Sequence, residues 1–366
     1  MPSETRTKLL QAPRRIRTFL ATQSDGPALF VAASEEDAER YARDASCFVD
    51  EKDFVHLPSR GVPYGDVFEP SATRVGKRQR ALHSLSSAKV VVAGPLALME
   101  KTPMYAPLNL SGGVEVEFEE TLERLVTLGY ERVDRVSRPG EFAVRGGIVD
   151  AFPSTRRSPA RVEWWGDEVE SVRAVSLATQ RVVRELDGVS VFAAREGDLA
   201  SLAAANEEYP EEAKRGVLVP GLDRLLLDLE PVSALDLLPE TVEVWREEAR
   251  EGVPSDLEEF VPELYDERGI EADVEFTGGE GGEVVSAPPL ALYANSLRES
   301  ARRLDEWAHD GMVVFIACAS SSDVKRAVYA FGEIDRGIKE AEIADANLPP
   351  GVYAIPGDIE EAFSYP

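Results

Sequence analysis

The residues best suited to recognition chemistry are arginines gathered in one stretch. From Tyr130 to Arg173 the sequence holds eight arginines and eight acidic residues, so this stretch has a net charge of 0 while the whole chain carries -27. A guanidinium offers a planar fork of donors that matches carboxylates and backbone carbonyls, and arginine is therefore common at protein interfaces. Charge by itself favours a solvated sheet face held together by weak ion pairs. The alternative is a surface that binds another protein.

Two glycine turns divide this stretch into β-hairpins that would position the arginines. Gly146-Gly147 and Gly166-Asp167 suit tight turns, because glycine permits positive φ. Alternation along the strand that follows places Val162 against a core and leaves Arg161 and Glu163 together on the other face. The β-prone segments are residues 142–145, 148–152, 161–165 and 168–173.

The same stretch resembles a known protein-docking module. The sequence reads GYER at 129–132, GEFAVRGGIVDAFP at 140–153, RVEWWGDEVESVR at 161–173 and TQR at 179–181. This pattern resembles the UvrA-binding module (the UvrB-interaction domain) shared by the nucleotide-excision-repair protein UvrB and the transcription-repair coupling factor Mfd. Residues 25–200 as a whole resemble the N-terminal region of the Mfd family.

The resemblance implies four UvrA-contacting residues, which are Arg132, Arg145, Arg161 and Glu163. Each arginine would make charge-assisted hydrogen bonds to carboxylates or carbonyls of UvrA. Glu163 would hold Arg161 in position or reach a cation on the partner.

Two observations leave parts of this assignment open. Where UvrB-like sequences place a further arginine, this chain has Ala143, so one contact of the family is in doubt. Arg145 has an alternative interpretation as a strand-end arginine that pairs with Asp150 or Glu141.

The segments around the arginine stretch predict a parallel α/β fold, because buried strands alternate with helices. Ser34 caps one helix with Asp37 at the capping-box position, and the helix over 71–84 has a basic face formed by Arg74, Lys77, Arg78 and Arg80. Expected helices are 4–21, 34–47, 71–84, 119–128, 197–206, 222–229, 255–267, 295–309 and 322–331. Expected strands or buried turns are 28–33, 54–57, 89–93, 216–219, 234–238, 241–245, 312–319, 341–343 and 351–355.

We therefore expect an α/β protein built around a degenerate, motor-like parallel α/β domain, residues 1–113 plus 192–272. The resemblance supports an arginine-rich α+β module inserted into it at residues 114–191. A Gly-rich acidic linker over 273–283 and a small α/β domain over 284–366 would follow. The resemblance implies that the family protein continues into an RNA-polymerase-interacting domain and a double-stranded-DNA translocase motor, so that this chain is an N-terminal fragment.

The sequence contains no motif for catalysis or cofactor binding. Its one Gly-Lys pair, Gly76-Lys77, is followed by Arg78 and lacks the upstream glycine of a phosphate loop. The three histidines lie in different elements without metal-ligand spacing. We expect no enzyme activity, cofactor or metal site, with ATP and Mg²⁺ required only by the family's motor. The acidity argues against binding of nucleic acid by this chain itself.

Two lone cysteines and no long apolar run predict a cytoplasmic protein without membrane contact. The functional hypothesis is a platform that recruits UvrA in transcription-coupled repair, with RNA polymerase and DNA contacted by other domains of the family protein. One alternative is a nucleotide-dependent repair helicase component like UvrB. The other is an unrelated α/β enzyme whose site is assembled by tertiary contacts.

Overall fold

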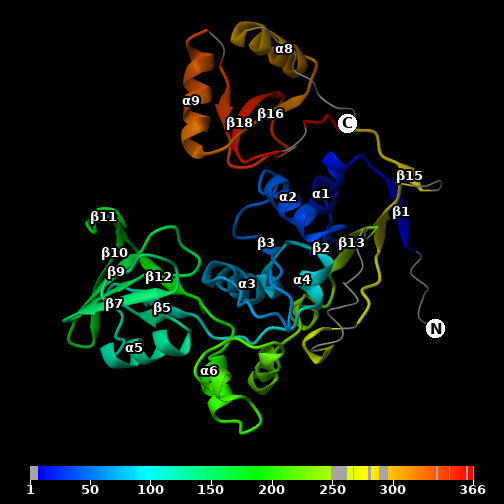
Figure 1. Ribbon diagram of the computed structural model, residues 1–366. Coiled ribbons are helices and arrows are strands. Elements are labelled where there is room, and N and C mark those ends of the chain that lie inside the picture. The colour runs from blue at the N-terminus through cyan, green and yellow to red at the C-terminus, as the bar shows by residue number, and fades with distance from the viewer. Residues whose placement is uncertain are drawn as a thin grey trace.

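A computed structural model of the chain describes residues 7–248, 262–266, 268–278, 282–287, 296–334, 337–345, 347–359 and 362–365. Three sheet-based units are visible in Figure 1: a large central sheet with helices, a β-rich module beside helix α3, and a small unit near the C-terminus. Among the described residues, no helix is long and apolar enough to cross a membrane.

The central sheet is parallel throughout, in the order β15-β1-β14-β13-β2-β4-β3. Its interior strand β2 is buried along its whole length, and its side chains alternate between two cores. Buried parallel strands read as continuous apolar runs for this reason. The strands are β1 Lys8–Gln11, β2 Ala28–Val31, β3 Phe54–Leu57, β4 Val90–Ala93, β13 Glu243–Glu247, β14 Val274–Phe276 and β15 Glu283–Val284.

Helices cover both faces of this sheet (Figure 1). Ile16 and Tyr41, from α1 and α2, join the core on one face, whereas Leu82 and Leu98, from α3 and α4, join the core on the other. As predicted, Ser34 caps α2 by accepting a hydrogen bond from the amide of Asp37. The helices are α1 Arg14–Thr22, α2 Glu35–Ala45, α3 Ala72–Ser84 and α4 Pro95–Met99.

The β-rich module contains a six-stranded sheet in the order β11-β10-β9-β8-β7-β6, with β6–β7 parallel and the other pairs antiparallel. Helix α5, Phe118–Thr127, and the pair β5–β12 pack with it. Both predicted hairpin turns are confirmed, with Gly146 at φ 60° and Gly166 at φ 62°. The strands are β5 Leu108–Ser111, β6 Glu131–Arg132, β7 Glu141–Arg145, β8 Ile148–Ala151, β9 Ala160–Trp165, β10 Glu168–Val175, β11 Val182–Leu186 and β12 Gly188–Val191.

The chain enters and leaves this module from the central sheet. Strands β13 and β14, which follow the module in sequence, pair with β2 and β1, which precede it. Between the module and β13 lie α6 Leu199–Ala204, α7 Glu211–Lys214 and the 3-10 helices Leu222–Leu229 and Ala234–Leu237. A further 3-10 helix, Pro262–Leu264, lies between β13 and β14. At the junction, a Cβ added to Gly76 of α3 would meet Ser154 Oγ at 2.1 Å, so only glycine allows this approach.

The small C-terminal unit has a parallel sheet in the order β16-β18-β17. Ser320 caps α9 by accepting a hydrogen bond from the amide of Asp323. The ring of Phe363 packs in tilted orientation against Phe19 and Phe48, and the amide of Ala344 donates to the carbonyl of Cys47 at 2.7 Å, so this unit packs against the α1–α2 side. The elements are α8 Leu297–His309, β16 Val313–Cys318, α9 Ser321–Gly332, β17 Lys339–Glu340 and β18 Gly351–Pro356.

Several local expectations differ from the structure. Residues 8–11 form β1 rather than part of a helix, because they pair with β14 and β15 from the far end of the sequence. Residues 216–219 form no strand, and 222–229 and 234–237 are 3-10 helices. The stretch expected as a linker, 273–283, contains β14 and the first residue of β15. The helix expected over 255–267 lies mostly outside the described residues.

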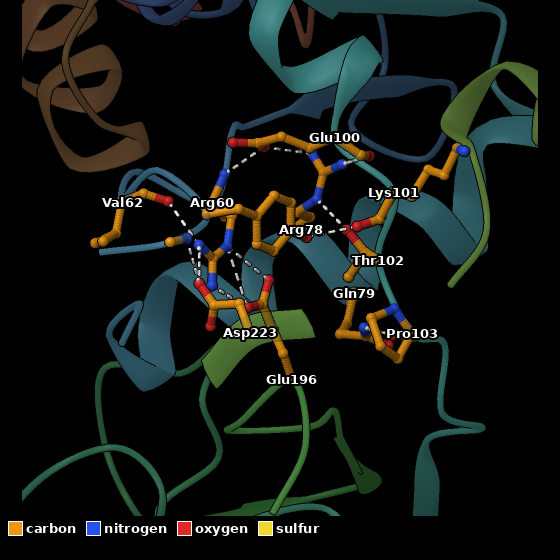
Figure 2. Close-up of polar contacts among 12 residues, drawn as sticks. Arg60, Val62, Arg78, Gln79, Glu100, Lys101, Thr102, Pro103, Glu196 and Asp223 are labelled. Carbon is orange, nitrogen blue, oxygen red and sulfur yellow. Dashed lines mark hydrogen bonds and ion pairs between the residues drawn. The ribbon is translucent and has the colours of Figure 1, made fainter. Parts of the chain in front are cut away.

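Two buried arginines hold the region where the central sheet meets the returning chain (Figure 2). Arg60 is 1% exposed, pairs with Glu196 at 2.6 Å and with Asp223 at 3.4 Å, and lies over the Tyr64 ring. Both acids lie beyond the module in sequence. A buried charge is tolerated only when it is paired and hydrogen-bonded, so the loop after β3 and the chain leaving the module are held together.

Arg78 corrects the expectation that it belongs to an exposed basic face. It is 1% exposed and donates hydrogen bonds to the carbonyls of Pro58, Ala97 and Glu100 and to the Thr102 hydroxyl, at 2.5 to 2.9 Å (Figure 2). Helix periodicity detects which residues share a face, but it does not reveal that loop carbonyls line that face.

We predict that Arg60→Met strongly destabilises the protein, because Glu196 and Asp223 would be left buried without their cation. The expected loss of unfolding free energy is about 3–5 kcal/mol, measured by urea denaturation. Arg224→Met is the matched control, since its ion pair with Glu263 is exposed and contributes less than about 1 kcal/mol. Equal unfolding midpoints for the two variants would contradict this role of Arg60.

We also predict a pH-dependent contribution from Glu100, which is fully buried. Burial raises its pKa to about 7, against the opposing charges of Arg78 and Arg60. Between the unfolded value of 4.5 and 7, the folded protein keeps a proton that the unfolded chain releases, so this group adds stability as the pH falls. Above pH 7 the carboxylate is charged in the folded protein, and its burial lowers the free energy of unfolding.

Glu100→Gln should therefore gain stability relative to the unmodified protein as the pH rises from about 5 to 8, by at most about 3 kcal/mol. Urea unfolding of both proteins at the two pH values measures this difference. A difference that does not change with pH would show that Glu100 does not titrate in this range.

Candidate functional site

The six-stranded sheet of the module has one apolar and one polar face, and its register decides which residues lie on each. Phe142, Ala151, Ala160 and Val162 lie on the apolar face and pack beneath α5 and the β5–β12 pair. Residues on the opposite face align across the strands in two rows. One row is Ala143, Asp150, Arg161, Arg173 and Glu185, and the next is Arg145, Ile148, Glu163 and Ser171.

Arg161 lies at the centre of the polar face and is held by its cross-strand neighbour. Its Nε and Nη2 donate to the two carboxylate oxygens of Asp150 at 2.7 and 2.8 Å. This paired hydrogen bond raises the pKa of Arg161, since Asp150 stabilises the charged form. The side chain remains partly exposed, so its orientation is fixed while part of the guanidinium still faces solvent.

Glu163 does not hold Arg161, contrary to one of the roles considered for it. Its carboxylate pairs with Arg173 on β10, and Arg173 is itself near Glu185 on β11. Asp150, Arg161 and Arg173 share one row and Glu163 belongs to the next, so the Glu163–Arg173 pair runs diagonally between the rows, beside the Asp150–Arg161 pair. This arrangement is the salt-bridged sheet face expected from charge alone, and it also presents preoriented charges to a partner.

Arg132 and Arg145 come together at the edge of the sheet. They line one shallow depression with Val133, Asp134 and Val144. Both are exposed, and Arg145 donates only to the backbone carbonyl of Asp134, at 3.2 Å. Within the described part of the chain, the Arg132 guanidinium has no hydrogen bond or ion pair, so both side chains are available to a partner.

The alternative partners considered for Arg145 are engaged elsewhere. Asp150 binds Arg161, and Glu141 accepts hydrogen bonds from Ser137 and Arg138. Burial raises the pKa of Glu141, but these hydrogen bonds outweigh the effect and bring the pKa below its usual range. The pairing of Arg145 with Asp150 or Glu141 is therefore not present.

Ala143 is buried, so its position could not present a side chain to a partner in this conformation. It is 3% exposed and packs with Val136 and Phe152 beneath the loop that follows β6. An arginine here would have to displace that loop. The departure from the UvrB-like pattern at Ala143 thus leaves the exposed surface unchanged.

Sequence reasoning missed Trp165, the most exposed large apolar side chain of the module. It is 82% exposed and lies at the end of β9, on the same face as Arg161 and Glu163. Its neighbour Trp164 is buried and donates to the carbonyl of Val116. The signal was available, because strand alternation requires that one of two adjacent tryptophans point away from the core.

The polar face can recognise a partner but has no evident chemistry of its own. In the described ranges, no three His, Cys, Asp or Glu residues are grouped so that they could hold a metal ion. The face instead combines exposed guanidinium donors, two fixed ion pairs and one exposed tryptophan. Arginine and tryptophan are the residue types most enriched where protein interfaces gain their binding energy.

Comparison with known proteins identifies this module. Residues 108–196 match the UvrB interaction domain family. The N-terminal half of the chain is similar to transcription-repair-coupling factors, with 36% identity over 205 residues to that of Mycobacterium bovis, 27% over 184 residues to that of Bacillus subtilis and 26% over 184 residues to that of Escherichia coli. These matches cover 52%, 48% and 48% of this chain, but only 16% of the length of each relative.

We predict that Ala143→Arg destabilises the module rather than adding a contact. A larger, charged side chain would have to enter the space occupied by Val136 and Phe152, at an expected cost of about 1–3 kcal/mol. Ser190→Arg, at an exposed position on β12, is the control and should change stability by less than about 0.5 kcal/mol. An Ala143→Arg protein as stable as the control would show that the loop opens freely.

Proposed function

We propose that the polar face of this module docks the nucleotide-excision-repair protein UvrA, and that the chain thereby recruits UvrA in transcription-coupled DNA repair. The observation that carries the proposal is the grouping of Arg145, Arg161, Glu163 and Trp165 on one face, with Arg132 beside Arg145 at the sheet edge, in a domain that matches the UvrB interaction domain. The relatives are named for coupling transcription to repair, which supports this setting.

The residues of the proposed docking surface differ in how far they are already paired within this chain. Arg132 and Arg145 are exposed and lack carboxylate partners among the described residues, so they can form new charge-assisted hydrogen bonds to UvrA without breaking existing ion pairs. Arg161 keeps its Asp150 partner and offers its remaining donor capacity in a fixed orientation. Trp165 supplies apolar area at the rim of the same face.

In this proposal the chain acts as a binding platform in the cytoplasm and not as an enzyme. The sequence offers no phosphate loop for ATP. RNA polymerase and double-stranded DNA would be engaged by other parts of a transcription-repair-coupling factor. The proposal needs no cofactor or metal on this chain, because protein docking alone brings UvrA to its place of action.

The test is titration of the chain with purified UvrA, comparing it with an Arg132→Glu/Arg145→Glu variant. The two exposed substitutions should weaken binding by roughly 100-fold, since each lost charge-assisted hydrogen bond is worth about 1.5 kcal/mol or more. Trp165→Ala should weaken binding by a further, independent step of about 2 kcal/mol, because exposed tryptophans anchor interfaces.

The matched control is Arg215→Glu/Arg298→Glu, which has the same change in charge at two exposed positions outside the module. It should bind UvrA like the unmodified chain. If both double variants weakened UvrA binding equally, the effect would come from the change in net charge and not from the module. Absence of UvrA binding by the unmodified chain would refute the proposal.

A further inference from the structure

A second arginine cluster lies at another edge of the module. The loop 153–159, PSTRRSP, and the segment 176–184, SLATQRVVR, contain four arginines and no acidic residue, in a chain whose net charge is -27. The two segments are adjacent in space, because the amide of Val175 donates to the carbonyl of Pro159 at 3.0 Å. Ala160, Ala174 and Arg184 then align across β9, β10 and β11. We name Arg156, Arg157, Arg181 and Arg184 the arginine edge.

The arginine edge is distinct from the polar face. Arg184 pairs in register with Ala174, whereas Glu185 pairs with Arg173. Successive residues of a strand point to opposite faces, so Arg184 lies on the side of the sheet away from Arg161 and Glu163. A ligand at the arginine edge would therefore not compete for the residues assigned to UvrA.

The cations of the arginine edge are not neutralised by the chain. Arg157, Arg181 and Arg184 are exposed, and among the described residues their guanidinium groups make no hydrogen bond or ion pair. Arg156 is half-buried, and its buried Nε has no hydrogen-bond partner. Burial and then the nearby charge of Arg184 lower the pKa of Arg156.

We propose that the arginine edge binds the phosphate backbone of double-stranded DNA. Grouped, unpaired guanidiniums repel each other, and a multivalent anion relieves that repulsion while satisfying the free donors. Hydroxyl groups of Thr155, Ser158 and Thr179 lie in the same two segments, and arginine together with Ser and Thr is the donor set that contacts DNA phosphates. Contacts of this kind are made to phosphates and carry no base information, so the proposed contact is independent of sequence.

The overall acidity of the chain restricts this binding without excluding it. Charges more than about 8–10 Å away are largely screened at physiological salt, so a ligand at the edge responds mainly to nearby charges, which are the four arginines and Glu185 next to Arg184. Net charge led to the expectation that this chain would not bind nucleic acid by itself. That argument adds up charges from surfaces that lie apart in the folded protein. The contact is weak, and it would hold DNA beside a module already engaged with a protein.

The experiment is fluorescence anisotropy of a labelled DNA duplex titrated with the full 366-residue chain, without UvrA, between about 50 and 200 mM salt. Each arginine that neutralises a phosphate contributes about -0.9 to the slope of log affinity against log salt. Arg157→Ser/Arg184→Ser should reduce the slope by about 1.8 and weaken binding at the lowest salt by roughly 10-fold. Both residues are exposed, so the variant should fold, which thermal denaturation verifies.

Arg215→Ser/Arg298→Ser is the charge-matched control and should leave both the affinity and the slope unchanged. Three results would overturn the proposal: no DNA binding at the lowest salt, equal losses in the two double variants, or binding of labelled polyglutamate in place of DNA. The last result would assign the edge to an acidic protein. Because UvrA is absent, failure here is independent of failure of the UvrA titration.

Discussion

The buried pairing of Arg60 with Glu196 and Asp223 is the constraint on which the remaining architecture depends. It joins a loop of the central sheet to two points of the chain that come after the module, across more than a hundred residues of sequence. Arg78 stabilises the neighbouring loops through their carbonyls. An unpaired charge at this depth would cost several kcal/mol, so the module's entry and exit are held in one arrangement.

A module held in this way can display its residues with little loss of entropy on binding. The apolar face of its sheet packs against α5 and the β5–β12 pair, which leaves the opposite face free to carry charge. The cross-strand ion pairs of Asp150 with Arg161 and of Glu163 with Arg173 restrain side chains that are otherwise among the most mobile. Preorganisation of this kind increases affinity without enlarging the contact area.

Charge is distributed unevenly over the protein, and the distribution separates its two surfaces. The polar face balances its arginines with acids, apart from the exposed Arg145, which lies beside Arg132 at the sheet edge, and it suits a protein partner with complementary charges. The arginine edge has no acids in its two segments and suits a polyanion. The net charge of the chain predicts the binding preference of neither surface. Salt screens distant charges, so each surface responds mainly to the charged residues near it.

The sequence by itself determined the alternation of strands and helices, the two glycine turns of the module, the capping of α2 by Ser34 and the group of arginines near 130–173. These features depend on local periodicity and on backbone freedom. Only the tertiary structure decided that residues 8–11 form a strand, that Arg78 is buried, that Glu163 pairs with Arg173, and that Ala143 lies beneath a loop. Each of these depends on residues distant in the sequence, whose approach is set by strand register and packing and leaves no local pattern.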